Sequence, residues 1–317
     1  MKRKSTTRAE RRKSRAQVGP LGNKLLQDKT LRLYRASIAA FLVWMQGEEK
    51  SWPSEAEELD EFMEEYVEHC WQQGDTRAEV ANLLSALSHP VTGLARAAKH
   101  LRGAWRYYGL WVKLEKKEKC LPIRPVTCRA IAGRAIARGW FDMAFVLLLA
   151  YHCLLRTQEF SEARCGDFEW SACSDKGVLR LPNTKSGKRN HVEEQVSITD
   201  KKLSAFGRAL MKDMQPGDRV LSCSIKVTRK RIRILLEDLG LENLYILQYS
   251  FRRGGATAHF RAGNSMASTM ARGRWSSATT ARVYINEAMA ALEAVQSEKQ
   301  EKLLLKASKK LSQFLSG

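Results

Sequence analysis

A charged segment with two prolines, residues 115–125 (EKKEKCLPIRP), divides this chain of 317 residues into two parts with different sequence patterns. Charges and prolines together do not continue a helix or a buried strand, so the segment is typical of a linker. A chain of this length is also too long for one ordinary hydrophobic core. We therefore expect two domains, residues 20–114 and 126–317, joined by this linker and preceded by a separate arm at residues 1–19.

The first expected domain, residues 20–114, has the pattern of a helical unit. Its apolar residues recur at the spacing of one helix face, and no alternating pattern typical of a strand interrupts them. Ser54 and Glu57 match the capping box that begins a helix, and Gly74 lies in a turn. The expected helices cover about 31–45, 54–73, 77–88 and 94–108.

Basic residues dominate the arm at residues 1–19, which contains almost no apolar side chain. Such a composition cannot form a core, and we expect it to be disordered. It would contact phosphate groups, direct nuclear import, or remain a solvated tail with neither role.

The chain is strongly basic, with 54 Lys and Arg against 34 Asp and Glu and a formal net charge of +20. This favours a polyanionic partner such as nucleic acid, because Lys and Arg that neutralise phosphates release condensed counterions. The alternative is a merely soluble basic protein. The seven cysteines form no Cys-x-x-Cys pair and the six histidines have no zinc-ligand spacing, which favours a reducing compartment and no metal site. No apolar run is long enough to cross a membrane.

The second expected domain, residues 126–317, combines helices with a small sheet. Two helices are expected to end near residues 139 and 151, and short strands are expected at 178–182 and 192–198. A Lys-Ser-Gly-Lys turn lies between these strands, and helices follow to the end of the chain. The predicted fold class is therefore mostly α with a small β-sheet (α+β).

Cleaving a phosphodiester without a metal requires a nucleophile, cationic donors for the non-bridging oxygens and an acid for the leaving oxygen. The second domain contains four segments with such groups. Arg156 follows an apolar helix, and Glu159 three residues later is placed to hold it, although a surface ion pair has the same spacing. Lys185 lies at the turn between the strands, where an ordinary charged turn is the alternative.

The third and fourth segments lie in the helices that follow. Tyr249 and Arg252 are three residues apart and share a helix face, which a basic helix start would also explain. Trp275 offers one indole N–H, and Ser276 or Ser277 is placed to cap a short helix that carries Tyr284. A single tyrosine more often belongs to a core. Gly254 and Gly255 indicate close packing or a close approach to DNA, and Gly263 marks the helix end.

Together these segments resemble the tyrosine recombinase, or phage integrase, family. The family signature is an Arg, a hairpin Lys, His-x-x-Arg, a His or Trp, and then the nucleophilic Tyr. The matching positions here are Arg156, Lys185, Tyr249 with Arg252, Trp275 and Tyr284. Trp275 follows Tyr249 by 26 residues and Tyr284 follows Trp275 by nine, which are gaps typical of the family. The run Arg-Arg-Gly-Gly-Ala-Thr-Ala is similar to eukaryotic or retroelement versions.

The resemblance implies a catalytic domain at 126–317 and a DNA-binding, core-binding domain at 20–114, which would clamp duplex DNA. It implies that Tyr284 forms a 3′-phosphotyrosyl link, that Arg156 and Arg252 hold the phosphate, and that Lys185 protonates the leaving 5′-oxygen. Trp275 would donate its N–H to the phosphate. No metal, ATP or other cofactor is implied. The residues expected to contact the DNA are Arg96, Lys99, Arg102, Arg106, Lys188, Arg253 and Arg274, and for the first four, on the helix at 94–108, a solvated basic face is the alternative.

The resemblance also bears on assembly and location. Such proteins form tetramers on DNA through a C-terminal helix, so the apolar residues of the tail, 286–317, are expected to dock into a neighbouring subunit or, alternatively, onto their own domain. The expected location is intracellular, and nuclear if the source is eukaryotic.

One departure from the signature concerns Tyr249, which stands where the family usually has His. A phenol donates or accepts a hydrogen bond but carries no positive charge near neutral pH. This difference motivates the first of three other interpretations that remain open beside the recombinase. They are a weakened relative that only binds DNA, a type IB topoisomerase, and a basic scaffold with accidental motifs.

Overall fold

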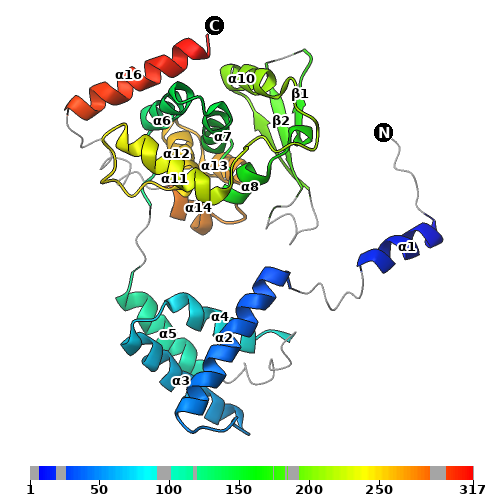
Figure 1. The fold of residues 1–317 in the computed structure, drawn as a ribbon, viewed down its shortest axis with the longest axis vertical. Coiled ribbons are helices and arrows are strands. Elements are labelled where there is room, and N and C mark those ends of the chain that lie inside the picture. The colour runs from blue at the N-terminus through cyan, green and yellow to red at the C-terminus, as the bar shows by residue number, and fades with distance from the viewer. Residues whose placement is uncertain are drawn as a thin grey trace. The chain divides into compact units, whose positions relative to one another are not determined.

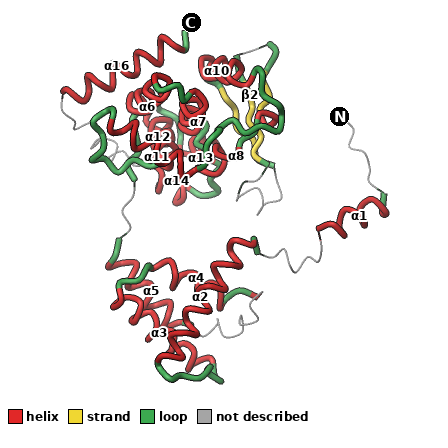
Figure 2. The backbone as a smooth tube through the Cα atoms, in the orientation of Figure 1, coloured by secondary structure: helices red, strands yellow, loops and turns green. Residues whose placement is uncertain are grey.

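The chain forms two compact units, Met1–Glu118 and Lys119–Gly317, and the division lies inside the segment expected to be a linker (Figure 1). In the computed structural model, the described residues are 7–18, 26–90, 101–116, 120–173, 175–182, 184, 193–285 and 298–316. Among these residues the strands all lie in the second unit, and helices make up most of the rest (Figure 2). The predicted fold class, mostly α with a small sheet, is confirmed.

Helices alone build the described part of the first unit. They are α1 (Arg8–Val18), α2 (Asp28–Gly47), α3 (Ala56–Gln73), α4 (Arg77–Leu87) and α5 (Arg102–Leu114). α3 packs on α5 and α2 packs on α4, which buries one apolar face of each helix. Phe41, Met63, Leu83 and Leu84 are fully buried at the centre of this core.

The start of α5 is fixed by a side chain from another helix. Asp60 on α3 accepts hydrogen bonds from the backbone N–H groups of Gly103 at 2.8 Å and Ala104 at 2.9 Å. A carboxylate at this place satisfies amides that have no partner within the helix and suits its positive end. The helix expected at 94–108 therefore differs from α5, which runs from Arg102 to Leu114, while residues 91–100 lie outside the described part of the chain.

Two expectations about helix starts in this unit were wrong. The arm at 1–19 was expected to be disordered, yet Arg8–Val18 is helical. A capping box explains the helix, because Thr7 Oγ1 accepts from the Glu10 N–H at 3.2 Å and Glu10 accepts from the Thr7 N–H at 2.7 Å. Ser54 does not cap α3, which has Glu55 at its N-cap.

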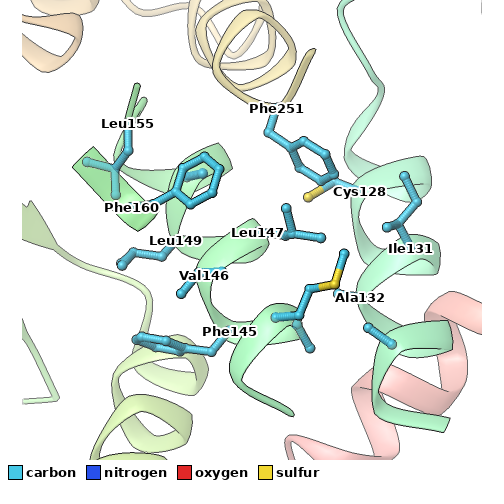
Figure 3. Close-up of a cluster of buried hydrophobic side chains, with 14 of the residues drawn as sticks. Cys128, Ile131, Ala132, Phe145, Val146, Leu147, Leu149, Leu155, Phe160 and Phe251 are labelled. Atoms are coloured by element: carbon cyan, nitrogen blue, oxygen red, sulfur yellow. The ribbon is translucent and has the colours of Figure 1, made fainter. Parts of the chain in front are cut away.

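In the second unit, the other elements pack around one apolar helix, α7 (Phe141–His152). Its helices before the sheet are α6 (Pro125–Ala137), α7, α8 (Thr157–Glu162) and the 3₁₀ turn η4 (Cys165–Asp167). After the sheet come α10 (Lys201–Met211), α11 (Ile225–Glu237), α12 (Gln248–Arg261), α13 (Met266–Gly273), α14 (Ala278–Tyr284) and α16 (Glu298–Phe314). α7 contacts α6, α10 and α12 and is apolar on nearly all sides, as expected for a core helix. Figure 3 shows Phe145, Leu147 and Leu149 of α7 facing side chains from its neighbours.

Three antiparallel strands form the sheet, in the order β1 (Phe168–Trp170), β2 (Gly177–Leu181) and β3 (Glu194–Ile198). β2 and β3 correspond to the expected strands at 178–182 and 192–198, although residues 191 and 192 lie outside the described part. β1 was not predicted, because three residues are too few for an alternating pattern. In β2 the buried and partly buried side chains alternate, so one face of the strand is turned to the core.

Two glycines allow α12 to lie against its neighbours. A Cβ on Gly254 would lie 2.2 Å from the carbonyl oxygen of Ile123, and one on Gly255 would lie 2.0 Å from that of Tyr151. Both obstacles are backbone atoms, which cannot rotate away. Of the two sequence interpretations, close packing rather than approach to DNA therefore explains Gly254 and Gly255.

We expect Gly255→Ala to destabilise the second unit by about 3 kcal/mol, because the methyl group would have to separate α12 from α7. The midpoint of thermal unfolding should fall by roughly 6–12 °C. Gly109→Ala is the matched control, since nothing lies within 4 Å of its Cβ position in α5. It should gain about 1 kcal/mol from helix propensity. Equal midpoints for Gly255→Ala and the wild type would refute the packing explanation.

The described part of the C-terminal tail, α16, lies on α6 of its own unit (Figure 1). Leu304, Ala307 and Leu311 are buried there, and a Cβ on Gly133 would lie 2.3 Å from the carbonyl oxygen of Ala307. Glu301 on α16 also pairs with Arg124 at 2.7 Å. In this structure the tail therefore makes the intramolecular contact, one of the two alternatives that the sequence leaves open. None of the described helices is apolar and long enough to cross a membrane.

Candidate active site

Arg156 is held at the start of α8 by the carboxylate three residues later. Its Nη1 donates to Glu159 Oε1 at 2.6 Å, and its backbone N–H donates to Glu159 Oε2 at 2.8 Å. The Glu159 side chain is only 5% exposed, while 28% of the Arg156 side chain remains accessible. This is the rigid support expected from the spacing, and it leaves one cationic group open to solvent.

Arg252 occupies a different environment, because its side chain is fully buried within α12. Its Nη1 donates to the carbonyl oxygen of Leu154, and its Nη2 donates to that of Gly273 at 2.7 Å. Its Nε has no partner among the described residues. Burial, together with the charges of Arg156 and Arg274, lowers the pKa of Arg252 to about 10. The guanidinium therefore lies behind the site and not on its surface.

The aromatic residues of the signature converge on this guanidinium. The Cζ atom of Arg252 lies 4.9 Å from the ring centre of Trp275 and 5.0 Å from that of Tyr284. The rings of Trp275 and Tyr284 are 4.5 Å apart, and those of Tyr249 and Tyr284 are 5.4 Å apart. Four predicted site residues from α12, α14 and the loop between α13 and α14 thus meet in one cluster.

Local sequence explains the position of Tyr284. Ser277 caps α14, with its Oγ accepting from the backbone N–H of Thr280 at 3.2 Å, so one of the two serines expected to cap does so. Tyr284 is the last residue of this short helix, and its backbone carbonyl accepts from Thr257 Oγ1 of α12 at 3.3 Å. The phenol is therefore placed by two helices.

The surroundings of Tyr284 favour its ionised form. Burial raises the pKa of the phenol, but a hydrogen bond from Tyr249 and the charges of Arg252 and Arg156 outweigh burial, so the pKa lies below its usual value. Tyr249 behaves in the opposite way, because burial and its interaction with Tyr284 raise its pKa. The two phenols are thus unequal, and Tyr284 is the one that ionises more easily.

A cavity of about 710 Å³ opens beside this cluster. Arg156, Tyr249, Trp275 and Tyr284 contribute to its wall together with Thr184, which precedes the expected catalytic lysine. The indole Nε1 of Trp275 is buried and, like Arg252 Nε, has no partner in the described part of the chain. A buried donor without an acceptor costs free energy unless a ligand supplies an oxygen, so the Trp275 N–H at the cavity wall suits a ligand with oxygen acceptors.

Four predicted residues cannot be placed. Lys185 and Lys188 of the expected turn and Arg96 and Lys99 of the first unit lie outside the described residues. Of the other residues expected to contact DNA, Arg102 and Arg106 are exposed on α5. Arg106 also lies 3.7 Å from Glu64.

The prediction that Arg253 contacts DNA was wrong for this structure, because its side chain is only 3% exposed. α12 is buried from Ser250 to Thr257 by the close packing that its two glycines permit. Arg274, also expected on the DNA surface, is 8% exposed and pairs with Glu159 at 2.5 Å and Glu194 at 3.1 Å, while it lines the cavity.

Sequence reasoning missed several residues of the cavity. Arg164 and Arg180 contribute to the wall from the η4 and β2 segments, and Glu194 at the start of β3 pairs with Arg274 of the wall. Nothing local in the sequence identifies them, because the folding of the sheet brings them to Arg156. No group of three His, Cys, Asp or Glu side chains suitable for a metal ion occurs within the described ranges.

No protein family model matches the sequence, and no curated protein matches it. Solved structures do match. The Tn1549 transposon integrase in complex with transposon right end DNA is 12% identical, with a TM-score of 0.60 over 85% of this chain and 93% of that chain. A lambda integrase dimer bound to a COC′ core site is 14% identical, with a TM-score of 0.55 over 84% of this chain and 74% of that chain. Its residues 75–356 in another such complex give 0.54 over 84% and 92%. The chain thus has the fold of the tyrosine recombinases.

Proposed function

We propose that this chain is a site-specific DNA recombinase or integrase of the tyrosine recombinase family, with Tyr284 as its nucleophile. The observation that carries the proposal is the cluster at the cavity. A phenol with a lowered pKa lies 5.0 Å from a buried guanidinium and shares the cavity wall with Arg156. The fold and the net charge of +20 support the same conclusion.

In the proposed reaction the Tyr284 oxygen attacks a DNA phosphorus, forming a 3′-phosphotyrosyl bond while the bond to the 5′-oxygen breaks. Arg156 binds a non-bridging oxygen from the cavity wall, and the charge of Arg252 acts on the phenolate and the phosphate from behind. The free N–H of Trp275 donates to the phosphate. Lys185 gives its proton to the leaving 5′-oxygen. A 5′-hydroxyl of a second strand then reverses the bond exchange, which needs no external energy source.

Duplex DNA is the proposed partner, with the exposed Arg102 and Arg106 of α5 among the residues that contact it. The affinity of the chain for duplex DNA is expected to fall steeply as the salt concentration rises. We further propose that four chains assemble on the DNA. In this tetramer α16 separates from α6 of its own chain and packs on a neighbouring subunit. The mass of the complex tests this, and a complex that holds one chain would refute it. We also propose that the basic arm at residues 1–19 directs import into a nucleus.

A covalent-capture experiment tests the function without knowledge of the target sequence. The full chain is incubated with a library of duplexes of random sequence, each with a nick downstream of the cleavage position, so that the short fragment bearing the freed 5′-hydroxyl diffuses away after cleavage. Complexes are recovered under denaturing conditions and sequenced. The proposal predicts a covalent protein–DNA adduct enriched in one target sequence. Adducts without enrichment, together with relaxation of supercoiled plasmid, would indicate a topoisomerase.

A DNA-binding relative without catalysis is the second candidate, and two observations favour it. Arg252 is fully buried with two of its nitrogens bonded to carbonyl oxygens, and Tyr249 supplies no positive charge. Retention of duplexes under native conditions, with no adduct after denaturation, would identify this candidate.

The variant Tyr249→His measures what the phenol contributes. An imidazole near the phosphate adds a donor that becomes cationic near neutral pH, so single-turnover cleavage should be equal to or faster than that of the wild type. The gain should not exceed about 10³-fold, the usual effect of one such donor. A clear loss of rate would show that Tyr249 has an essential role, such as holding Tyr284.

A further inference from the structure

Arg274 is the feature of the site that the proposed mechanism does not use. It has φ 56° and ψ 47°, the left-handed conformation that costs an L-residue free energy and that glycine adopts freely. Backbone strain of this kind persists where the surrounding structure fixes it, and it occurs often at functional sites. The reason for an arginine at this position must therefore lie in its side chain.

The side chain of Arg274 pairs with two carboxylates that are distant from it in the sequence. Its Nη2 donates to Glu159 Oε2 at 2.5 Å, and its Nε lies 3.1 Å from Glu194 Oε2. Only 8% of the side chain is exposed, and that part lines the cavity. In such a position an ion pair is screened little by solvent, so its loss affects the neighbouring charges strongly.

Glu159 is thereby shared between two guanidinium groups. Its Oε1 accepts from Arg156 and its Oε2 accepts from Arg274. When Arg252 is counted, whose charge interacts with that of Glu159 without an ion pair, these side chains comprise three guanidinium groups and two carboxylates and carry one net positive charge. Without Arg274 the same cluster would be neutral, and Glu159 would be free to neutralise Arg156 alone.

We infer that Arg274 is a positioning residue of an anion site: by neutralising Glu159, it leaves the Arg156 guanidinium available to bind a phosphate group. The inference deepens the proposed function in that the anion would be the phosphate that Tyr284 attacks. It concerns an equilibrium, however, and is measured without any cleavage of DNA.

The test is a double-mutant cycle with inorganic phosphate, measured by titration calorimetry on the full chain at low ionic strength. Arg274→Gly should weaken phosphate binding by roughly tenfold to a hundredfold, the range for one charge-assisted interaction. Adding Glu159→Gln should restore binding to within about threefold of the wild type, because the carboxylate that competes for Arg156 is gone. A purely structural role for Arg274 predicts no such recovery.

Controls separate charge from folding. Arg282→Ala removes one positive charge from an exposed position of α14 and should change binding by less than about twofold. Glycine relieves the backbone strain at position 274, but Glu159 and Glu194 lose a cationic partner, so the thermal unfolding of Arg274→Gly is measured beside the titration to show that the variant is folded at the titration temperature. If it does not fold, Arg274→Gln replaces it in the cycle, with the same expected loss and recovery.

Three results would overturn the inference: no saturable phosphate binding by the wild type, unchanged binding by Arg274→Gly, or no recovery in the double variant. The outcome is independent of cleavage. Phosphate binding that follows the cycle in a chain without adduct would refute the proposed function and sustain the role of Arg274. If adduct forms but Arg274→Gly does not change phosphate binding, the proposed function would stand and the role of Arg274 would be refuted.

Discussion

Tyr284→Phe is expected to abolish the covalent protein–DNA adduct while leaving DNA binding within about twofold of the wild type. The substitution removes only the oxygen that would form the bond to phosphorus. The ring remains, so the contacts with Trp275 at 4.5 Å and with the Arg252 guanidinium at 5.0 Å are kept. The measurement is adduct yield on a captured target duplex after denaturation, beside binding by electrophoretic mobility shift.

Tyr245→Phe is the matched control, because it removes the same atom from a phenol that is 43% exposed and does not line the cavity. It should form adduct at the rate of the wild type. An adduct that persists in Tyr284→Phe would show that another group attacks, and Tyr249 would be the first candidate because its ring lies 5.4 Å from that of Tyr284.

Arg156→Ala is expected to slow single-turnover cleavage by about 10²–10³-fold or more, with a much smaller effect on DNA affinity. Arg156 is an accessible guanidinium on the cavity wall that Tyr284 also lines, and its interaction with phosphate should strengthen as charge develops on the oxygens. Its loss also leaves Glu159 with Arg274 as its remaining close cation, so the charge of the site falls by one.

Arg138→Ala serves as the control for this substitution. Arg138 is an exposed residue whose guanidinium pairs with Asp238, with both hydrogen bonds at 2.7 Å, outside the cavity. Cleavage should be unchanged by it. If Arg156→Ala instead weakened DNA binding and cleavage by equal factors, Arg156 would contribute to binding alone and the proposed catalytic role would be wrong.

The parts of the site that the sequence could predict are those fixed by local spacing. Glu159 holds Arg156 because three residues separate them at a helix start, and Ser277 caps the helix of Tyr284 for the same kind of reason. Helices α2, α3, α4, α6 and α7 and two of the three strands follow likewise from periodicity and turn residues.

The rest depends on packing between distant segments. The burial of Arg252 and Arg253 results from the close packing of α12 on α7 and on Ile123. The glycines permit this packing, but their presence in the sequence does not predict which segments come together. Arg274 and Glu159 are 115 residues apart, so no spacing rule predicts their contact. The start of α5 is fixed by Asp60 of another helix, whose carboxylate accepts hydrogen bonds from the first backbone N–H groups of α5. Such contacts exist only after the fold has formed.

The most direct test of the central claim is to identify the residue that carries DNA in the captured adduct. After nuclease and trypsin digestion, Tyr284 lies in the peptide 283–299, and Tyr249 lies in the peptide 234–252. Mass spectrometry should find the added nucleotide on Tyr284. A nucleotide on Tyr249 or on any other residue would contradict the account, as would a denatured complex with no nucleotide attached.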